Sequence, residues 1–219
     1  MTRFGILISG RGSNMEALAR ATQELEHASV AVVCSNKPSA PGLDIATSMG
    51  LPTAVLSHKG YPKRRDYNRA LATTLRAYEV DWVLLAGFMR ILGGGFLDSF
   101  GGRVMNIHPS LLPAFPGLNP QRQALEAGVS ESGCTVHLVD RGTDTGPIVA
   151  QAAVPVHPGD DEQALSARIL EAEHRLYPAV MQWIAAGQLH VDGGTVSHDI
   201  PREAFERIGA IPPRMGPTG

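Results

Sequence analysis

The sequence has 219 residues, of which 43% are hydrophobic and 18% are charged, so we expect one folded domain, or at most one domain with a small appendage. The formal net charge is −2 and the isoelectric point is about 6.4, so no global positive field exists to attract nucleic acid or an anionic membrane. We therefore expect small-molecule partners, with no nucleic acid and no membrane.

The first residues of the chain and its two cysteines indicate the cellular compartment of the protein. The only early apolar run, from Phe4 to Ile8, is too short for a signal-peptide core or a membrane span. The two cysteines, Cys34 and Cys134, lie on separate strand-like runs, which is not the spacing of a disulfide framework or a metal knuckle. We expect a cytoplasmic protein with reduced, partly buried thiols.

The first motif is GRGSN, which follows the strand-like run FGILIS and precedes an amphipathic stretch from Met15 to about Glu24. Ser13 or Asn14 is expected to cap that helix, and the N–H groups at its start would attract a phosphate. A glycine-rich turn without a ligand explains the same residues equally well. The full GxGxxG spacing is missing and no acidic residue closes the second strand, so a dinucleotide is disfavoured.

Strand-like and helix-like runs alternate over the first half of the chain. After SVAVVC come a helix at 42–49 and a short strand at 53–56, and this alternation predicts an α/β fold with an open, mostly parallel, Rossmann-like sheet and helices on both faces. A further helix is expected from Lys63 to Tyr78. Arg64 at its start would suit a ligand anion, although a solvated basic face is the commoner explanation.

DWVLLAG, residues 81–87, is the clearest central strand and runs directly into FMRIL, residues 88–92. Apolar residues around an arginine just past a strand end would line a slot for a flat heteroaromatic ring. The alternative is that Met89, Ile91 and Leu92 pack under the next loop while Arg90 extends outward.

The stretch RVMNIHPSLLPAFPGLNPQ, residues 103–121, is a short apolar strand that ends in a proline-rich loop. Asn106 and His108 are two residues apart on that strand, so both side chains lie on the same side of it. An amide donor beside an imidazole suits a carbonyl that becomes an oxyanion, because the amide stabilises the charge and the imidazole relays protons. The alternative is a hydrogen-bonded histidine at a strand end.

A short helix at 122–127 is followed by GCTVHLVD, a half-buried strand that carries His137, and then by the loop RGTDTGPI and the strand IVAQAAVPV. Asp144 lies in that loop. A lone loop aspartate is usually a turn former, but here it could meet His108 if the two follow neighbouring strand ends.

The last part of the chain is expected to hold one long helix from about Glu162 to Ala186, capped by Asp160 or Asp161. Glu173 and His174 on it face either a substrate or solvent. LHVDGGTVSHD predicts a small hairpin that turns at 193–194. We expect a single domain over residues 1–200 and a mobile tail over 201–219.

With GRGSN, LAGFMRIL, NIHPSLLP, GTDTGPI and AEHRLYP placed in order, the sequence resembles the phosphoribosylglycinamide formyltransferases over roughly residues 3–190. The resemblance implies a formyltransferase fold, 10-formyltetrahydrofolate as co-substrate, no required metal, and a monomer or homodimer. It implies that a formyl group passes to the amine of 5'-phosphoribosylglycinamide in purine biosynthesis. Three sets of residues are implied: catalytic Asn106, His108 and Asp144; glycinamide ribonucleotide-binding Gly12, Ser13, Asn14 and Glu173; and folate-binding Arg64, Met89, Arg90, Ile91, Leu92, Asn106, Asp140 and Asp144.

By this resemblance, Asn106 and a protonated His108 would hold the oxyanion while Asp144 favours the charged imidazole. Residues 119–121 read Asn-Pro-Gln where we expect a histidine, which weakens the substrate contacts expected of the loop at 110–131. A zinc site at His108, His137 and Asp144 lacks compact ligand spacing.

Rival functions are a formyltetrahydrofolate hydrolase, with an added amino-terminal regulatory domain, and a methionyl-tRNA formyltransferase, with an added basic RNA-binding domain. A nucleotide-binding module without catalysis is a further alternative.

Overall fold

The computed structural model describes residues 1–192 and 195–212, and its backbone forms two compact units, residues 1–106 and 107–219. We call them the N-terminal and the C-terminal unit. The single domain expected over residues 1–200 stays a prediction.

The N-terminal unit is built on parallel strands in the order β3-β2-β1-β4-β5. Their side chains are almost all buried, as expected for a parallel sheet that is covered on both faces. The strands are β1 (Thr2–Ile8), β2 (Ala28–Ser35), β3 (Thr53–Val55), β4 (Trp82–Leu85) and β5 (Val104–His108).

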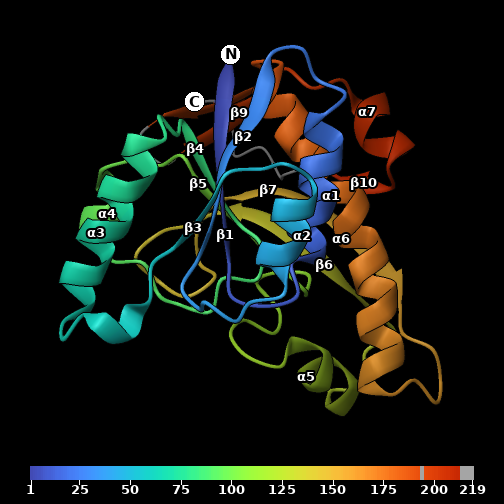
Figure 1. Cartoon of the computed structure of the whole chain (residues 1–219). Coiled ribbons are helices and arrows are strands. Elements are labelled where there is room, and N and C mark those ends of the chain that lie inside the picture. The colour runs from blue at the N-terminus through green and yellow to red at the C-terminus, as the bar shows by residue number, and fades with distance from the viewer. Residues whose placement is uncertain (193–194, 213–219) are drawn as a thin grey trace. The chain divides into compact units, whose positions relative to one another are not determined.

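Helices cover both sides of this sheet, which confirms the predicted architecture. Helix α1 packs against α2 on one side of β1 and β2, and α3 packs against α4 on the other side (Figure 1). The bounds are α1 (Ser13–Thr22), α2 (Gly42–Ser48), the 3-10 turn η1 (His58–Gly60), α3 (Arg64–Ala77) and α4 (Gly94–Asp98).

The start of α1 differs from the prediction. The helix begins at Ser13, two residues early, and its N-cap is Gly12, so neither Ser13 nor Asn14 caps it. Gly12 adopts φ 82°, and a Cβ there would lie 2.7 Å from the Cα of Gly42. Positive φ and this close approach to α2 both require glycine, so the GRGSN turn has a structural reason that is independent of any ligand.

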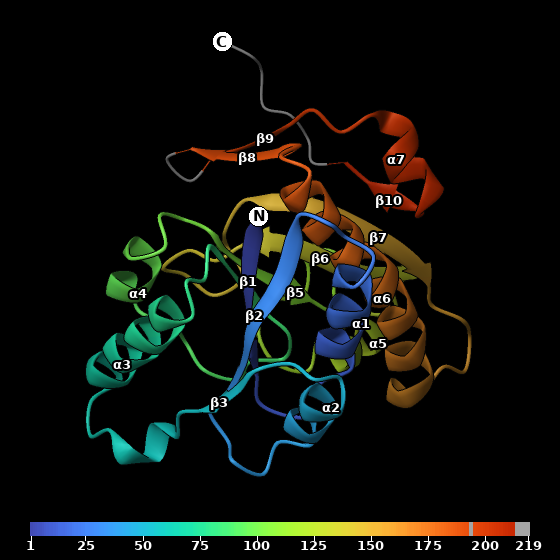
Figure 2. The same ribbon diagram turned by 45° about the horizontal axis from the view of Figure 1, so that its top comes forward.

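The C-terminal unit contains antiparallel strands. Strand β6 pairs with β7, and β7 also pairs with β10, while β8 and β9 form a separate hairpin (Figure 2). The long helix α6 packs on β6 and β7, and it also contacts α5. The elements are α5 (Pro120–Glu126), β6 (Glu131–Leu138), β7 (Ile148–Pro155), α6 (Glu162–Ala185), β8 (Leu189–Asp192), β9 (Thr195–His198), α7 (Arg202–Arg207) and β10 (Ala210–Ile211).

Of the two candidate caps of α6, the structure selects Asp161, whose Oδ1 accepts from the Ala164 N–H at 2.7 Å. Asp160 instead accepts from both Arg168 and the His157 N–H, and Arg168 lowers the pKa of Asp160 to about 2. Asp160 therefore fixes the loop before α6, and Asp161 begins the helix.

The mobile tail predicted over residues 201–219 includes a helix and a strand, and its mobility stays a prediction. Helix α7 forms there, its Phe205 is buried against Trp183, and β10 pairs with β7. The predicted hairpin is confirmed by the pairing of β8 with β9, whereas its turn at 193–194 and the tail at 213–219 lie outside the described residues.

Candidate active site

In the N-terminal unit, predicted site segments follow neighbouring parallel strands, whose carboxyl ends meet at one edge of the sheet. GRGSN follows β1, Met89 to Leu92 follow β4, and Asn106 lies beside Leu85 in the β4–β5 register. The buried Ser9 hydroxyl accepts from the Met89 N–H at 2.8 Å and donates to Asn36 at 2.6 Å. The end of β1 is thereby tied to the predicted folate segment.

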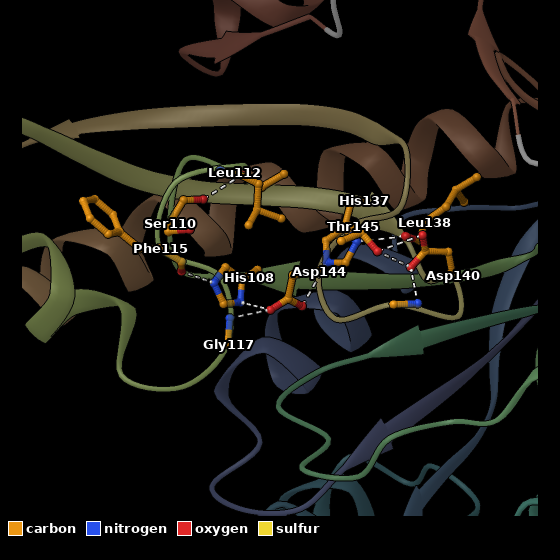
Figure 3. Close-up of polar contacts among 12 residues, drawn as sticks. His108, Ser110, Leu112, Phe115, Gly117, His137, Leu138, Asp140, Asp144 and Thr145 are labelled. Carbon is orange, nitrogen blue, oxygen red and sulfur yellow. Dashed lines mark hydrogen bonds and ion pairs between the residues drawn. The ribbon is translucent and has the colours of Figure 1, made fainter.

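His108 is the last residue of β5, and the residue is 5% exposed. Its Nδ1 lies 3.4 Å from Oδ2 of Asp144, and its Nε2 lies 3.0 Å from the carbonyl oxygen of Phe115 (Figure 3). The predicted meeting of His108 with Asp144 is confirmed. The Phe115 carbonyl oxygen can only accept, so Nε2 is the donor of that hydrogen bond, while Nδ1 faces the Asp144 carboxylate, with which the ring forms an ion pair when it is charged.

Asp144 is positioned by its backbone and by the loop that follows His108. It adopts φ 54°, a left-handed conformation that aspartate tolerates better than most residues, in the loop between β6 and β7. Its Oδ2 also accepts from the Gly117 N–H at 2.9 Å, and its side chain is 14% exposed. The carboxylate therefore joins two loops within the C-terminal unit and does not face into open solvent.

His137 on β6 lies on the other side of the same carboxylate, with Nε2 3.7 Å from Asp144 Oδ1 (Figure 3). Desolvation by burial lowers the pKa of His137 more strongly than its bond to the Leu138 carbonyl and the charge of Asp144 raise it. We conclude that His137 is neutral near pH 7 and that its contact with Asp144 is not then an ion pair. The alternating pattern of β6 predicted a half-buried strand, but His137 is 2% exposed although it lies opposite the apolar residues of that pattern.

A buried hydroxyl anchors the loop that begins after His108. Thr135 Oγ1 donates to the Ser110 carbonyl at 2.7 Å and accepts from the Leu112 N–H at 3.0 Å and from Gln151 Nε2 at 2.8 Å. Each of its bonds is to a different residue, so Thr135 joins β6, β7 and the loop. Thr135 was not predictable from the sequence, because a threonine in a strand carries no distinctive signal.

Asp140, which the resemblance implies for folate binding, shapes the loop that carries Asp144. Its carboxylate accepts from Thr145 Oγ1 at 2.8 and 2.9 Å and from the Gly142 N–H at 3.0 Å. The structure thus gives Asp140 a conformational role in the loop, and its folate contact stays a prediction.

The other predicted folate residues lie in the N-terminal unit. Met89 and Ile91 are 62% and 61% exposed, so the alternative in which they pack beneath a loop is wrong for both, whereas Leu92 is buried as that alternative expects. Arg64 and Arg90 are exposed at the start of α3 and in the loop after β4. Large exposed apolar side chains beside an arginine fit a surface that binds a ligand.

Glu173 lies on α6 and is only 6% exposed, so the solvated face considered for it is wrong. Its charge raises the pKa of the Cys134 thiol, although burial of that thiol is the larger cause. Cys34 and Cys134 are both free, as predicted, and they are fully buried where partial burial was expected.

At the expected histidine position, Asn119 adopts φ 55° and is the N-cap of α5. Asparagine tolerates this left-handed conformation better than most residues, and Pro120 suits the first position of a helix. Asn119 and Pro120, which stand where a histidine was expected, thus form the start of α5.

Two further findings bear on the class of protein. Over residues 1–192 and 195–212, no three histidine, cysteine or carboxylate side chains are grouped so as to hold a metal ion. None of the helices in those ranges has the length and apolar character needed to cross a membrane.

The parallel sheet and the polar residues that follow its strands indicate the class of protein to which this chain belongs. A model of the formyl transferase family matches residues 2–181, so the chain belongs to this family. This finding confirms the family suggested by the ordered motifs and the predicted fold class.

Individual relatives within the family give a finer comparison than the family model. The chain is 45% identical over 186 residues to the phosphoribosylglycinamide formyltransferase of Escherichia coli, covering 84% of this chain and 87% of that protein. It is 51% identical over 188 residues to a trifunctional purine biosynthetic protein, adenosine-3, of Drosophila melanogaster, covering 84% of this chain but spanning only 14% of that relative. The crystal structure of glycinamide ribonucleotide transformylase 1 from Symbiobacterium toebii is similar at a TM-score of 0.87, with 48% identity over 90% of this chain and 94% of that one.

Proposed function

We propose that this protein transfers the formyl group of 10-formyltetrahydrofolate to the amine of 5'-phosphoribosylglycinamide, giving formylglycinamide ribonucleotide and tetrahydrofolate in de novo purine biosynthesis. The observation that carries the proposal is the 3.4 Å approach of His108 Nδ1 to Asp144 Oδ2, with Asn106 two residues before the histidine on β5. Two relatives that are named for this activity, and of which the chain covers 87% and 94%, support it.

In the proposed reaction, the neutral amine attacks the formyl carbon on N10 of the folate and forms a tetrahedral intermediate with an oxyanion. Asn106 and the His108 imidazolium donate hydrogen bonds to that oxygen, and Asp144 stabilises the charged ring. The intermediate collapses as the carbon–N10 bond breaks, and the proton lost by the attacking amine passes to N10 through His108 or an ordered water.

The His108 ring must exchange one of its partners for this to happen. Nε2 donates to the Phe115 carbonyl at 3.0 Å, and the same nitrogen would donate to the oxyanion. We therefore propose that the segment around Phe115 shifts when substrate binds, while Nδ1 stays on Asp144.

Binding residues complete the proposal. The start of α1, with Gly12, Ser13 and Asn14, would hold the ribonucleotide phosphate, because N–H groups and the helix dipole favour an anion there. Glu173 would take the amine end of that substrate. The folate would contact Arg64, the segment from Met89 to Leu92, and the loop of Asp140 and Asp144.

The direct test follows the absorbance change on folate deformylation with purified protein. Signal that requires both substrates is the expected result. Signal with formyl-folate alone would establish the hydrolase instead, and tight binding of both compounds without turnover would establish a non-catalytic module.

We also propose that no metal takes part. Dialysis against a chelator is expected to leave turnover unchanged. A lasting loss that added zinc restores would overturn this part of the mechanism.

The remaining proposals concern the compartment, the partners and the oligomeric state of the enzyme. We propose a cytoplasmic protein with small-molecule partners that acts as a monomer or homodimer. Light scattering on the protein as it elutes from a size-exclusion column measures the oligomeric state. An assembly larger than a dimer would contradict that part of the proposal.

A further inference from the structure

A row of hydrogen-bonded groups crosses the carboxyl ends of four neighbouring parallel strands of the N-terminal unit. In the sheet order β3-β2-β1-β4, these strands are followed by His58, Asn36, Ser9 and Met89. Each of the four residues is hydrogen-bonded to the next one in the same order. We call them the strand-end network. Met89 belongs to the predicted folate segment, whereas His58 and Asn36 have no place in the predicted site.

The chemistry of these groups sets the direction of the hydrogen bonds. The Met89 N–H can only donate, so the Ser9 hydroxyl accepts from it at 2.8 Å and uses its own proton to donate to Asn36 Oδ1 at 2.6 Å. Asn36 Nδ2 can only donate, so His58 Nδ1 accepts from it at 3.2 Å and the ring proton lies on Nε2. The main-chain oxygen of Asn36 is farther from the same ring nitrogen, at 3.4 Å.

The middle of the strand-end network is closed to water. Ser9 is 4% exposed and Asn36 is 1% exposed, so each polar atom there needs a protein partner. His58 holds the Asn36 amide with Nδ2 towards the ring and Oδ1 towards Ser9. The flipped amide would direct a donor at Ser9 and leave the buried hydroxyl proton without its acceptor. His58 thus controls the hydroxyl that binds the Met89 N–H.

The His58 ring is also held from α3. Tyr67, which is 3% exposed, contacts it edge to face with ring centroids 6.3 Å apart, and Tyr61 packs on Tyr67 at 5.7 Å. Burial raises the pKa of Tyr67, and the charge of Arg90 opposes that rise, so the guanidinium lies near these rings. The main chain of Met89 and the side chain of Arg90 therefore both lie beside groups that His58 contacts.

The turn that begins at Gly10 is held independently of these side chains. The Ser9 N–H donates to the Gly87 carbonyl at 3.1 Å, and the Gly42 N–H donates to the Gly10 carbonyl at 3.1 Å. The Met89 N–H, in contrast, donates to a side-chain hydroxyl. Loss of the strand-end network should therefore disturb the predicted folate segment more than the predicted phosphate turn.

We propose that Asn36 and His58 are positioning residues for the formyl-folate. They hold the Ser9 hydroxyl in the orientation that accepts from the Met89 N–H, and so keep the segment from Met89 to Leu92 in the conformation that binds the co-substrate. This proposal rests on the proposed function, since it concerns the site of the same co-substrate.

The test measures the dissociation constant of tetrahydrofolate by calorimetry, which needs no turnover, and then kcat and the KM of each substrate. A neutral hydrogen bond changes an equilibrium constant by about two-fold to ten-fold, so we expect Ser9→Ala to weaken tetrahydrofolate binding about ten-fold and His58→Phe about three-fold. Phenylalanine keeps an aromatic ring against Tyr67 but has no acceptor for Asn36. The KM of formyl-folate should rise with the dissociation constant, while kcat and the KM of the ribonucleotide stay unchanged.

His58→Asn is the matched variant, because its side-chain oxygen can replace Nδ1 as the acceptor, and it should bind tetrahydrofolate as the wild type does. His27→Phe makes the same change as His58→Phe at an exposed histidine and should have no effect. In a Ser9→Ala background, His58→Phe should add no further loss, because a residue that acts through the hydroxyl has nothing left to hold.

Three results would each overturn the proposal: unchanged tetrahydrofolate binding in His58→Phe, an equal loss in His58→Asn, or a KM that rises equally for both substrates. A full further loss in the double variant would also overturn it. Failure of the proposed function is separate, because it shows as absence of two-substrate turnover in the wild type.

Discussion

At the scale of single residues, the proposed mechanism depends on two hydrogen-bond donors near the end of β5, Asn106 and His108. Removing one oxyanion donor commonly lowers turnover by about 100-fold to 1000-fold. We expect Asn106→Ala and His108→Ala each to lower kcat in that range in the two-substrate assay. Circular dichroism should show folded protein, and near-normal turnover of either variant would contradict its role.

His137, to which no catalytic role was assigned from the sequence, offers a control for this prediction. It contacts the same carboxylate as His108, but at 3.7 Å and on the other oxygen. We expect His137→Gln to lower kcat much less than His108→Ala does. An equal loss would show that both rings act on the substrate.

At the scale of elements, the strands and long helices were predictable because their apolar runs are continuous. The residues at β5 and in the β6–β7 loop were predictable as a pair, since polar residues after neighbouring strands converge. Gly12 as an N-cap was not predictable, because the need for glycine comes from the close approach of α2. Strand β10 has two residues, too few for any periodicity, and is formed by pairing with β7.

The loop after His108 gives a prediction at this scale. Thr135→Val keeps the shape of the side chain but removes a hydroxyl that makes three hydrogen bonds and is fully buried. We expect the free energy of unfolding to fall by about 1–3 kcal/mol, because buried polar partners are left unsatisfied. Urea denaturation measures this change.

Thr135→Ser is the matched control, since it retains the hydroxyl and should retain most of the stability. If both variants lose stability equally, the packing of the threonine methyl group matters and the hydrogen bonds do not.

At the scale of the whole molecule, acid stability should reflect the buried His137. Burial lowers its pKa below the ordinary value of 6.5, so the unfolded chain binds a proton before the folded one does. The stability from the neutral ring is complete above about pH 6.5 and is lost as the pH falls towards the lowered pKa. We expect His137→Gln to flatten this part of the stability profile.

Thermal or urea unfolding between neutral and mildly acidic pH measures this profile. The exposed His27 provides the control, and His27→Gln should leave the slope unchanged. A wild-type profile that is already flat in this window would contradict the assignment of His137 as neutral.

The central claim is that His108 and Asp144 act as one unit on the migrating formyl group, and a double-mutant cycle of kcat with His108→Ala and Asp144→Asn tests it. Asp144→Asn alone should lower kcat by about 10-fold to 100-fold, since it removes the carboxylate charge that lies 3.4 Å from the charged ring. Residues that act as a unit give strongly non-additive effects, so the double variant should be no slower than His108→Ala. Two losses that simply multiply would show that the carboxylate and the imidazole work independently, and would contradict the account.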